Sequence, residues 1–264
     1  MIDTLFSHDV LVAFGVCAAA AAATMIGALS IFIAHKDNTR LLSFGLAFAG
    51  GAMVYISLVE IFWKSHADFS AIFEDKQAYS YATLAFFGGV MLIAAIDRII
   101  PNPHNALTVE DGDQTVLKRV GLMAALAITA HNFPEGMATF FATLEEPVVG
   151  SSLAFAIAVH NIPEGVSIAI PVYYATQSKR MAVLACGMSA LAEPLGALIG
   201  YLILAPFLSP FVFAIIFGVI AGVMVFLAMD ELLPTAKRYS TGHDTVYGMI
   251  IGMACIALSL VLFR

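Results

Sequence analysis

The chain has 264 residues, of which 61% are hydrophobic and only 12% are charged, with a mean hydropathy of +0.92 and a net charge of −7. A soluble domain carries roughly a quarter charged residues, because its surface must stay in contact with water. The composition therefore excludes an ordinary soluble domain and predicts a membrane protein. Its three cysteines, Cys17, Cys186 and Cys255, lie singly and form no CxxC motif, so thiol chemistry is not expected.

Uncharged runs predict an all-α, polytopic membrane protein with eight transmembrane helices, since about 20 apolar residues span a bilayer core. The runs occupy most of the chain, so we expect a single transmembrane domain over residues 1–264. The longest connection is a polar loop at about 98–119. The predicted spans are residues 10–33, 41–63, 79–97, 120–143, 150–174, 181–205, 211–229 and 245–263.

The basic residues predict which side of the membrane each loop faces. Nine of the twelve Lys and Arg residues fall in the loops that follow the first, third, fifth and seventh spans. Cytoplasmic loops carry an excess of basic residues, so these loops are predicted to be cytoplasmic. Both termini and the acidic loop near Asp75 are then outside.

One sequence repeat falls within two neighbouring spans. Residues 127–136 read Ala-Ile-Thr-Ala-His-Asn-Phe-Pro-Glu-Gly, and residues 156–165 read Ala-Ile-Ala-Val-His-Asn-Ile-Pro-Glu-Gly. Each histidine lies about ten residues into its span, or ~15 Å deep at 1.5 Å per residue. The two spans run antiparallel, so both copies are predicted to meet near the bilayer midplane. Midplane sites on interrupted helices at a repeat interface are typical of secondary transporters.

Each copy combines metal-ligating side chains with a helix-breaking residue. His131 and Glu135 are four residues apart, as are His160 and Glu164, so each pair projects from one face of its helix. The proline within each motif removes a backbone hydrogen bond and is expected to bend its helix at the site.

The spans place carboxylates deep in the bilayer with no Lys or Arg to neutralise them. A charged side chain at the centre costs roughly 2.5–3.5 kcal/mol even on the lenient insertion scale. A bound divalent cation would supply the missing positive charge. Imidazole together with carboxylate suits zinc, iron, cobalt and manganese, whereas calcium and magnesium prefer oxygen alone.

The spacing predicts two neighbouring metal sites on the fourth, fifth and sixth spans. The first comprises His131, Glu135, His160 and Glu164, a set compatible with tetrahedral zinc. The second comprises Asn132, Asn161 and Glu193 with the shared Glu135 and Glu164. The competing interpretation is that these polar residues only hold helices together, as Asn and His often do. Two copies at matched depth, each with Pro and Gly, favour the metal sites.

Three further acidic residues lie in predicted spans or at their ends. Glu60 has no basic partner in its span, and a role in the ion pathway and a role at a helix interface both stay open. Asp230 and Glu231 follow the seventh span directly and are expected to form a solvated helix end.

The two His-Asn-x-Pro-Glu-Gly motifs, the Leu-Ala-Glu that ends at Glu193 and the Met-Asp-Glu-Leu-Leu-Pro of residues 229–234 resemble the ZIP (Zrt/Irt-like) metal transporter family. The resemblance covers essentially the whole chain. It implies uptake of Zn²⁺, with tolerance for Fe²⁺, Mn²⁺ and Co²⁺, through a binuclear site formed by the seven residues named above. It also implies that spans one, four, five and six move as a unit, and that a homodimer forms in some members. The loop at 98–119 departs from the family in holding the single histidine His104.

The prediction is therefore a non-enzymatic metal carrier, multi-pass in a bacterial inner membrane, whose partners are divalent ions and lipid. No resident cofactor and no nucleic acid are expected. An intramembrane metallohydrolase would also place His and carboxylates on helices, but the chain has no His-Glu-x-x-His and no separate catalytic acid. A metal-gated channel stays open as an alternative, because carrier and pore differ in motion rather than in ligands.

Overall fold

The structure is a computed structural model that describes residues 7–32, 39–99, 114–240 and 242–263. Within these residues it contains helices and no strand. The elements are α2 (His8–Ala28), η1 (Leu29–Phe32), α3 (Thr39–Ile56), η2 (Ser57–Ile61), α4 (Phe62–Ser70), α5 (Asp75–Ile99), α6 (Gln114–Glu145), α7 (Pro147–Thr176), α8 (Lys179–Leu204), η4 (Ala205–Phe207), α9 (Pro210–Leu227), η5 (Ala228–Leu232), α10 (Leu233–Tyr239) and α11 (Asp244–Phe263).

Seven helical stretches of the described chain are long and apolar enough to cross a membrane. They are His8–Phe32, Leu42–Ser70, Asp75–Arg98, Pro147–Tyr173, Lys179–Phe207, Pro210–Tyr239 and Asp244–Leu262. The protein is therefore a multi-pass, all-helical membrane protein. The predicted fourth span corresponds to α6, a helix of 32 residues that packs on α7 and α8. The middle of the expected loop at 98–119 lies outside the described residues, while α5 continues to Ile99 and α6 begins at Gln114.

Serine side chains fix the beginnings of three of these helices. The hydroxyl oxygens of Ser7, Ser178 and Ser209 each accept a hydrogen bond from the backbone N–H three residues later. These bonds satisfy donors that have no partner within the helix. At the other end of α7, Gln177 adopts a left-handed conformation with φ 53°, which ends the helix and turns the chain towards α8.

Two helices extend well beyond their apolar runs. The second span continues through the π-helical segment η2, which contains Glu60, to Ser70. The seventh continues through the π-helical segment η5 to Tyr239. Asp230 and Glu231 lie within η5, so the expectation that they form a helix end is corrected. All three acidic side chains are partly exposed.

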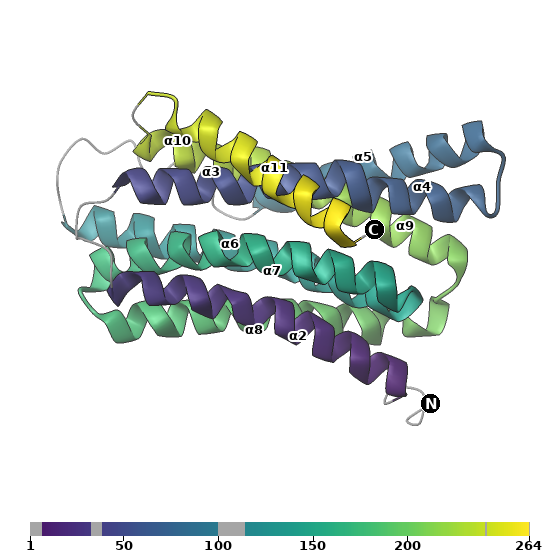
Figure 1. The fold of residues 1–264 in the computed structure, drawn as a ribbon, viewed down its shortest axis with the longest axis horizontal. Coiled ribbons are helices and arrows are strands. Elements are labelled where there is room, and N and C mark those ends of the chain that lie inside the picture. The colour runs from purple at the N-terminus through teal and green to yellow at the C-terminus, as the bar shows by residue number, and fades with distance from the viewer. Residues whose placement is uncertain (1–6, 33–38, 100–113, 241, 264) are drawn as a thin grey trace.

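The helices form two groups. Figure 1 shows α2, α6, α7 and α8 together on one side, and α3, α4, α5, α9, α10 and α11 on the other. We refer to α2, α6, α7 and α8 as the four-helix group. It packs on the other helices mainly through α7 against α3 and α11, and through α6 against α9.

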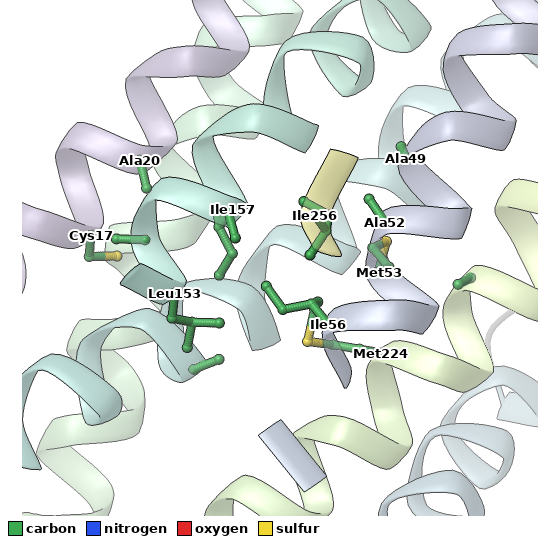
Figure 2. Close-up of a cluster of buried hydrophobic side chains, with 14 of the residues drawn as sticks. Cys17, Ala20, Ala49, Ala52, Met53, Ile56, Leu153, Ile157, Met224 and Ile256 are labelled. Carbon is green, nitrogen blue, oxygen red and sulfur yellow. The ribbon is translucent and has the colours of Figure 1, made fainter. Parts of the chain in front are cut away.

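Where α7 faces α3 and α11, the contact between the two groups is apolar (Figure 2). Leu153 and Ile157 of α7 are fully buried there, together with Ile56 of α3, Met224 of α9 and Ile256 of α11. The four-helix group is thus joined to the other helices in this region by side-chain packing and not by hydrogen bonds between polar side chains.

A pair of hydrogen bonds is arranged as expected if the two long helices of the second group, α3–η2–α4 and α9–η5–α10, are inverted copies of each other. Ser65 Oγ donates to the carbonyl oxygen of Ala214 at 2.6 Å, and Ser43 Oγ donates to that of Ala236 at 2.8 Å. The first bond joins the end of α3–α4 to the start of α9, and the second joins the start of α3 to α10. The two long helices therefore run antiparallel, and in both bonds a serine of α3 or α4 donates to an alanine carbonyl oxygen of α9 or α10.

The sequences of these two helices agree with this relation. Residues 51–62 read Gly-Ala-Met-Val-Tyr-Ile-Ser-Leu-Val-Glu-Ile-Phe, and residues 222–233 read Gly-Val-Met-Val-Phe-Leu-Ala-Met-Asp-Glu-Leu-Leu. In both helices the π-helical segment falls at the same place in the repeat. Inverted repeats of this kind are a common construction of secondary transporters.

Candidate metal centre

The seven side chains predicted to bind metal are all buried in the four-helix group. They are His131, Asn132, Glu135, His160, Asn161, Glu164 and Glu193, and each is at most 2% exposed. The first three lie on α6, the next three on α7 and the last on α8.

Three of these residues form a compact group of ligand atoms. One ligand atom each from Glu135, His160 and Glu164 lies within 4.8 Å of the other two. His160 Nε2 lies 3.2 Å from Glu135 Oε1 across the α6–α7 contact. The four-residue spacing places His160 and Glu164 on one face of α7, and that face meets Glu135 of α6. His131 is 1% exposed on α6, one turn before Glu135, but lies outside this compact group.

The two asparagines bind neighbouring helices through their amide N–H groups. Asn161 Nδ2 donates to Glu193 Oε1 at 2.7 Å and to the Ala20 carbonyl oxygen at 3.0 Å. Asn132 Nδ2 donates to the carbonyl oxygen and the hydroxyl oxygen of Ser189, both at 3.2 Å. The amide groups thus hold α7 against α2 and α8, and α6 against α8, while the amide oxygens remain available.

Several potential metal-ligating atoms of the site have no hydrogen-bond partner among the described residues. They are Asn132 Oδ1, Glu135 Oε2, His160 Nδ1, Asn161 Oδ1, Glu164 Oε1 and Glu193 Oε2. Buried polar atoms in native proteins are nearly always paired, so such atoms need an explanation. Several of them lie within one set of potential metal ligands, and their lone pairs would suit a bound cation.

The charge of the site supports the same conclusion. Glu135, Glu164 and Glu193 are each at most 2% exposed, and no buried side chain of the described residues is Lys or Arg. Buried charges in proteins are paired or coordinate metals, because an isolated buried carboxylate is costly. The arrangement is therefore suited to a divalent cation.

The prolines of the motifs do not interrupt their helices. Pro134 lies inside α6, Pro163 inside α7 and Pro194 inside α8, and each helix continues through its proline as a single element. The expectation of interrupted helices is therefore corrected. Neighbouring helices that pack tightly on both sides keep these segments helical although each proline lacks a backbone donor.

Glycine allows α6 and α8 to approach closely at the site. A methyl group on Gly136 would overlap the carbonyl oxygen of Glu193, and one on Gly196 would overlap that of Phe133. The motif glycine after Glu135 is thus the residue that lets α8 bring Glu193 to the site.

The chain is closely similar to known transporters. A family model described as ZIP zinc transporter matches residues 102–260. The zinc transporter ZupT of Xanthomonas campestris pv. campestris is 60% identical over 263 residues, which cover 98% of this chain and 97% of that protein. The ZupT protein of Neisseria meningitidis serogroup C is 60% identical over 258 residues, 96% of each chain, and that of Oceanobacillus iheyensis is 46% identical over 264 residues, 96% of this chain and 98% of the relative.

The protein is multi-pass and helical, and it buries carboxylates and imidazoles where antiparallel helices meet. Ion-transporting membrane proteins are built in this way. The similarities are more specific. The chain belongs to the ZIP zinc transporter family, whose members are transporters and not enzymes. This confirms the resemblance inferred from the two His-Asn-x-Pro-Glu-Gly motifs.

Proposed function

We propose that this protein takes up Zn²⁺ across the bacterial inner membrane into the cytoplasm, with Fe²⁺, Mn²⁺ and Co²⁺ as further cargo. The observation that supports this most strongly is the group formed by Glu135, His160 and Glu164, whose ligand atoms lie within 4.8 Å of one another inside the four-helix group. Zinc takes nitrogen and carboxylate oxygen ligands in tetrahedral sites, and the group offers both. The zinc transporters to which the chain is similar support the same cargo.

The first ion position consists of this group and His131. His131 lies one helical turn from Glu135 on α6, so a change of side-chain conformation brings its ring towards the three other ligands. Four ligands, two imidazoles and two carboxylates, then surround one zinc ion.

The second ion position lies beside the first and shares Glu135 and Glu164 with it. Its own ligands are Asn132, Asn161 and Glu193. The bond of 2.7 Å between Asn161 Nδ2 and Glu193 Oε1 supports this grouping, because it brings the α7 and α8 members together. Three carboxylates against two divalent ions leave the site near neutrality.

The route across the membrane uses α6 as the eighth crossing, with both termini outside. The first residue of α2 and the last described residue of α11 lie towards the same end of the bundle, which supports an even number of crossings (Figure 1). The apolar packing of α7 on α3 and α11 supports movement of the four-helix group against the rest, because packed helices can shift past one another by shear. The ion pair of Lys64 with Glu145 at the end of α6 joins the two groups elsewhere.

The test is zinc uptake into sealed proteoliposomes by the wild type and by Glu135→Gln. Glu74→Gln is the matched control, because Glu74 is an exposed carboxylate outside the four-helix group. We expect saturable uptake by the wild type and the control, and none by Glu135→Gln. Absence of zinc uptake by correctly inserted wild type, or full uptake by Glu135→Gln, contradicts the proposal.

A further inference from the structure

A buried threonine of α2, Thr24, lies beside the motif of α7, because its carbonyl oxygen is packed against Gly165. Thr24 is 0% exposed, and its Oγ1 atom has no hydrogen-bond partner among the described residues. The two other buried threonines, Thr139 and Thr143, each donate to the carbonyl oxygen four residues earlier, at 3.0 and 2.7 Å. Thr24 differs from both.

The reason is that the carbonyl oxygen which Thr24 would use is already occupied. In an α-helix the carbonyl of Ala20 accepts the backbone N–H of Thr24. It also accepts Asn161 Nδ2, at 3.0 Å. A carbonyl oxygen has two lone pairs, so no acceptor remains for the hydroxyl. The motif asparagine of α7 therefore displaces the usual partner of Thr24 and leaves the hydroxyl oxygen open.

A second sequence repeat relates α2 to α8 and places Thr24 relative to Glu193. Residues 23–29 of α2 read Ala-Thr-Met-Ile-Gly-Ala-Leu, and residues 192–198 of α8 read Ala-Glu-Pro-Leu-Gly-Ala-Leu. Four of the seven residues are identical, and Thr24 aligns with Glu193. The two helices run antiparallel, because Lys179 at the start of α8 lies over the ring of Phe32 at the end of η1, 4.9 Å from its centroid.

Backbone contacts confirm the alignment in three dimensions. A methyl group on Gly165 would overlap the carbonyl oxygen of Thr24, just as one on Gly136 would overlap that of Glu193. Gly165 follows the ligand Glu164, and Gly136 follows the ligand Glu135. Thr24 therefore faces the α7 copy of the motif in the way that Glu193 faces the α6 copy.

Side-chain contacts repeat in the same way. Cys17 Sγ lies 3.7 Å from the carbonyl oxygen of Gly136, and Cys186 Sγ lies 3.4 Å from that of Gly165. The cysteines align with each other in α2 and α8, as Thr24 and Glu193 do. The contacts of α2 and α8 around the site are thus alike. Thr24 and Glu193, which take equivalent places in the two helices, differ in chemistry.

We propose that Thr24 is an additional binding residue for the transported ion, and that its hydroxyl oxygen donates to the ion, directly or through one water molecule, from the α2 side of the site. This inference rests on the proposed function of the Glu135, His160 and Glu164 group. It assigns each flank of the centre one oxygen donor, a carboxylate from α8 and a neutral hydroxyl from α2. A neutral donor at this position adds an oxygen ligand without adding a fourth negative charge to the three buried carboxylates.

The test compares three substitutions at Thr24 by zinc uptake into sealed proteoliposomes. Thr24→Val and Thr24→Ala remove the hydroxyl, whereas Thr24→Ser retains it. Loss of a group that supports a metal ligand set typically lowers metal affinity 10- to 100-fold. We expect the zinc concentration for half-maximal uptake to rise about 10-fold or more in Thr24→Val and Thr24→Ala, and to change less than about 3-fold in Thr24→Ser. Thr143→Val is the control, because it removes a buried hydroxyl that donates to the Thr139 carbonyl oxygen of its own helix, outside the proposed ligand set, and it should keep the wild-type half-saturation value.

The thermal midpoint of the metal-free protein separates binding from stability. A merely structural role would lower this midpoint in Thr24→Val, whereas a ligand role leaves it unchanged, because the hydroxyl has no partner to lose. Wild-type half-saturation in Thr24→Val and Thr24→Ala, or equal losses in Thr24→Ser and Thr24→Ala, overturns the inference. If Glu135→Gln abolishes uptake in the same vesicles while Thr24→Val does not affect it, only the role of Thr24 fails. If the wild type does not take up zinc, the proposed function itself fails.

Discussion

Replacement of Glu135 by Gln is the most informative single change to the candidate centre, because Glu135 belongs to both proposed ion positions. The substitution keeps the size of the side chain and removes one of three buried negative charges. Glu135 Oε1 lies 3.2 Å from His160 Nε2, and an amide oxygen or nitrogen can keep this contact. The change is therefore close to a pure removal of charge from the site.

The size of the effect follows from the geometry of the ligand group. Its ligand atoms lie within 4.8 Å of one another, so an ion among them would lie closer than that to each carboxylate. Even at 4.8 Å, a divalent ion and a carboxylate attract by about 7 kcal/mol in an effective dielectric of about 20. The loss of hydration that the ion undergoes on binding offsets part of this attraction. If a net ~3 kcal/mol of the attraction remains, losing it raises the dissociation constant for zinc more than 100-fold, at 1.4 kcal/mol for each factor of ten.

The protein itself should tolerate the change. A carboxylate within the bilayer costs roughly 2.5–3.5 kcal/mol on the insertion scale, and an uncharged amide costs less. The metal-free Glu135→Gln variant is therefore expected to insert normally and to unfold at the same temperature as the wild type or higher. Equilibrium dialysis with zinc measures the affinity, and thermal unfolding without metal measures the stability. A wild-type zinc affinity in this variant, or a loss of affinity that merely follows a loss of folded protein, would refute the reasoning.

Three further changes test other parts of the account. Replacing both His131 and His160 by Asn should depress zinc uptake more than manganese uptake in competition assays, because imidazole suits zinc and amide oxygen suits harder ions; equal depression of both would contradict the division into two positions. Gly136→Ala should lower the thermal midpoint by an amount equivalent to about 1–3 kcal/mol, since its methyl group overlaps the Glu193 carbonyl, whereas Gly88→Ala, which meets nothing within 4 Å, should not. A cysteine introduced at Asp75 should react with an impermeant thiol reagent from outside intact cells, while the wild type should not; protection of that cysteine would reverse the proposed topology.

The sequence alone predicts the class of protein and the meeting of three of the candidate site residues, because both depend on signals that are strong at the level of single residues. Charges are so rare in the chain that each buried one is informative, and the same His-Asn-x-Pro-Glu-Gly motif occurs twice. The spacing of His160 and Glu164 predicts their common face, and the reversal of the chain near Glu145 predicts that α6 and α7 meet. The structure brings Glu135, His160 and Glu164 together accordingly.

The ends of the long helices could not be predicted, because polar residues there are neutralised by residues distant in sequence. Lys64 interrupts the apolar run of the second span, yet the helix continues to Ser70. In the structure Lys64 Nζ forms ion pairs with Asp68, one turn later, and with Glu145 at the end of α6. A criterion based on uncharged runs ends the helix where the three-dimensional contacts allow it to continue.

The role proposed for Thr24 of α2 could not be predicted from the sequence for a different reason. The repeat that relates α2 to α8 consists mostly of Ala, Gly and Leu, which are too common in a membrane protein to stand out. Thr24 has no charge and no motif of its own. The alignment of Ala-Thr-Met-Ile-Gly-Ala-Leu with Ala-Glu-Pro-Leu-Gly-Ala-Leu is the signal that could have identified it, and its meaning becomes evident only from the matched contacts at Gly136 and Gly165.

The most direct test of the central claim is the zinc X-ray absorption spectrum of the purified, zinc-loaded protein. The account predicts a first shell of nitrogen and oxygen atoms at about 2.0–2.2 Å, with the outer-shell scattering of imidazole, and no sulfur. Replacing Glu135 by Gln should reduce the bound zinc and change this shell. A sulfur shell at about 2.3 Å, which would assign the zinc to Cys17 or Cys186, or a spectrum without imidazole that is the same in the wild type and in Glu135→Gln, would contradict the claim.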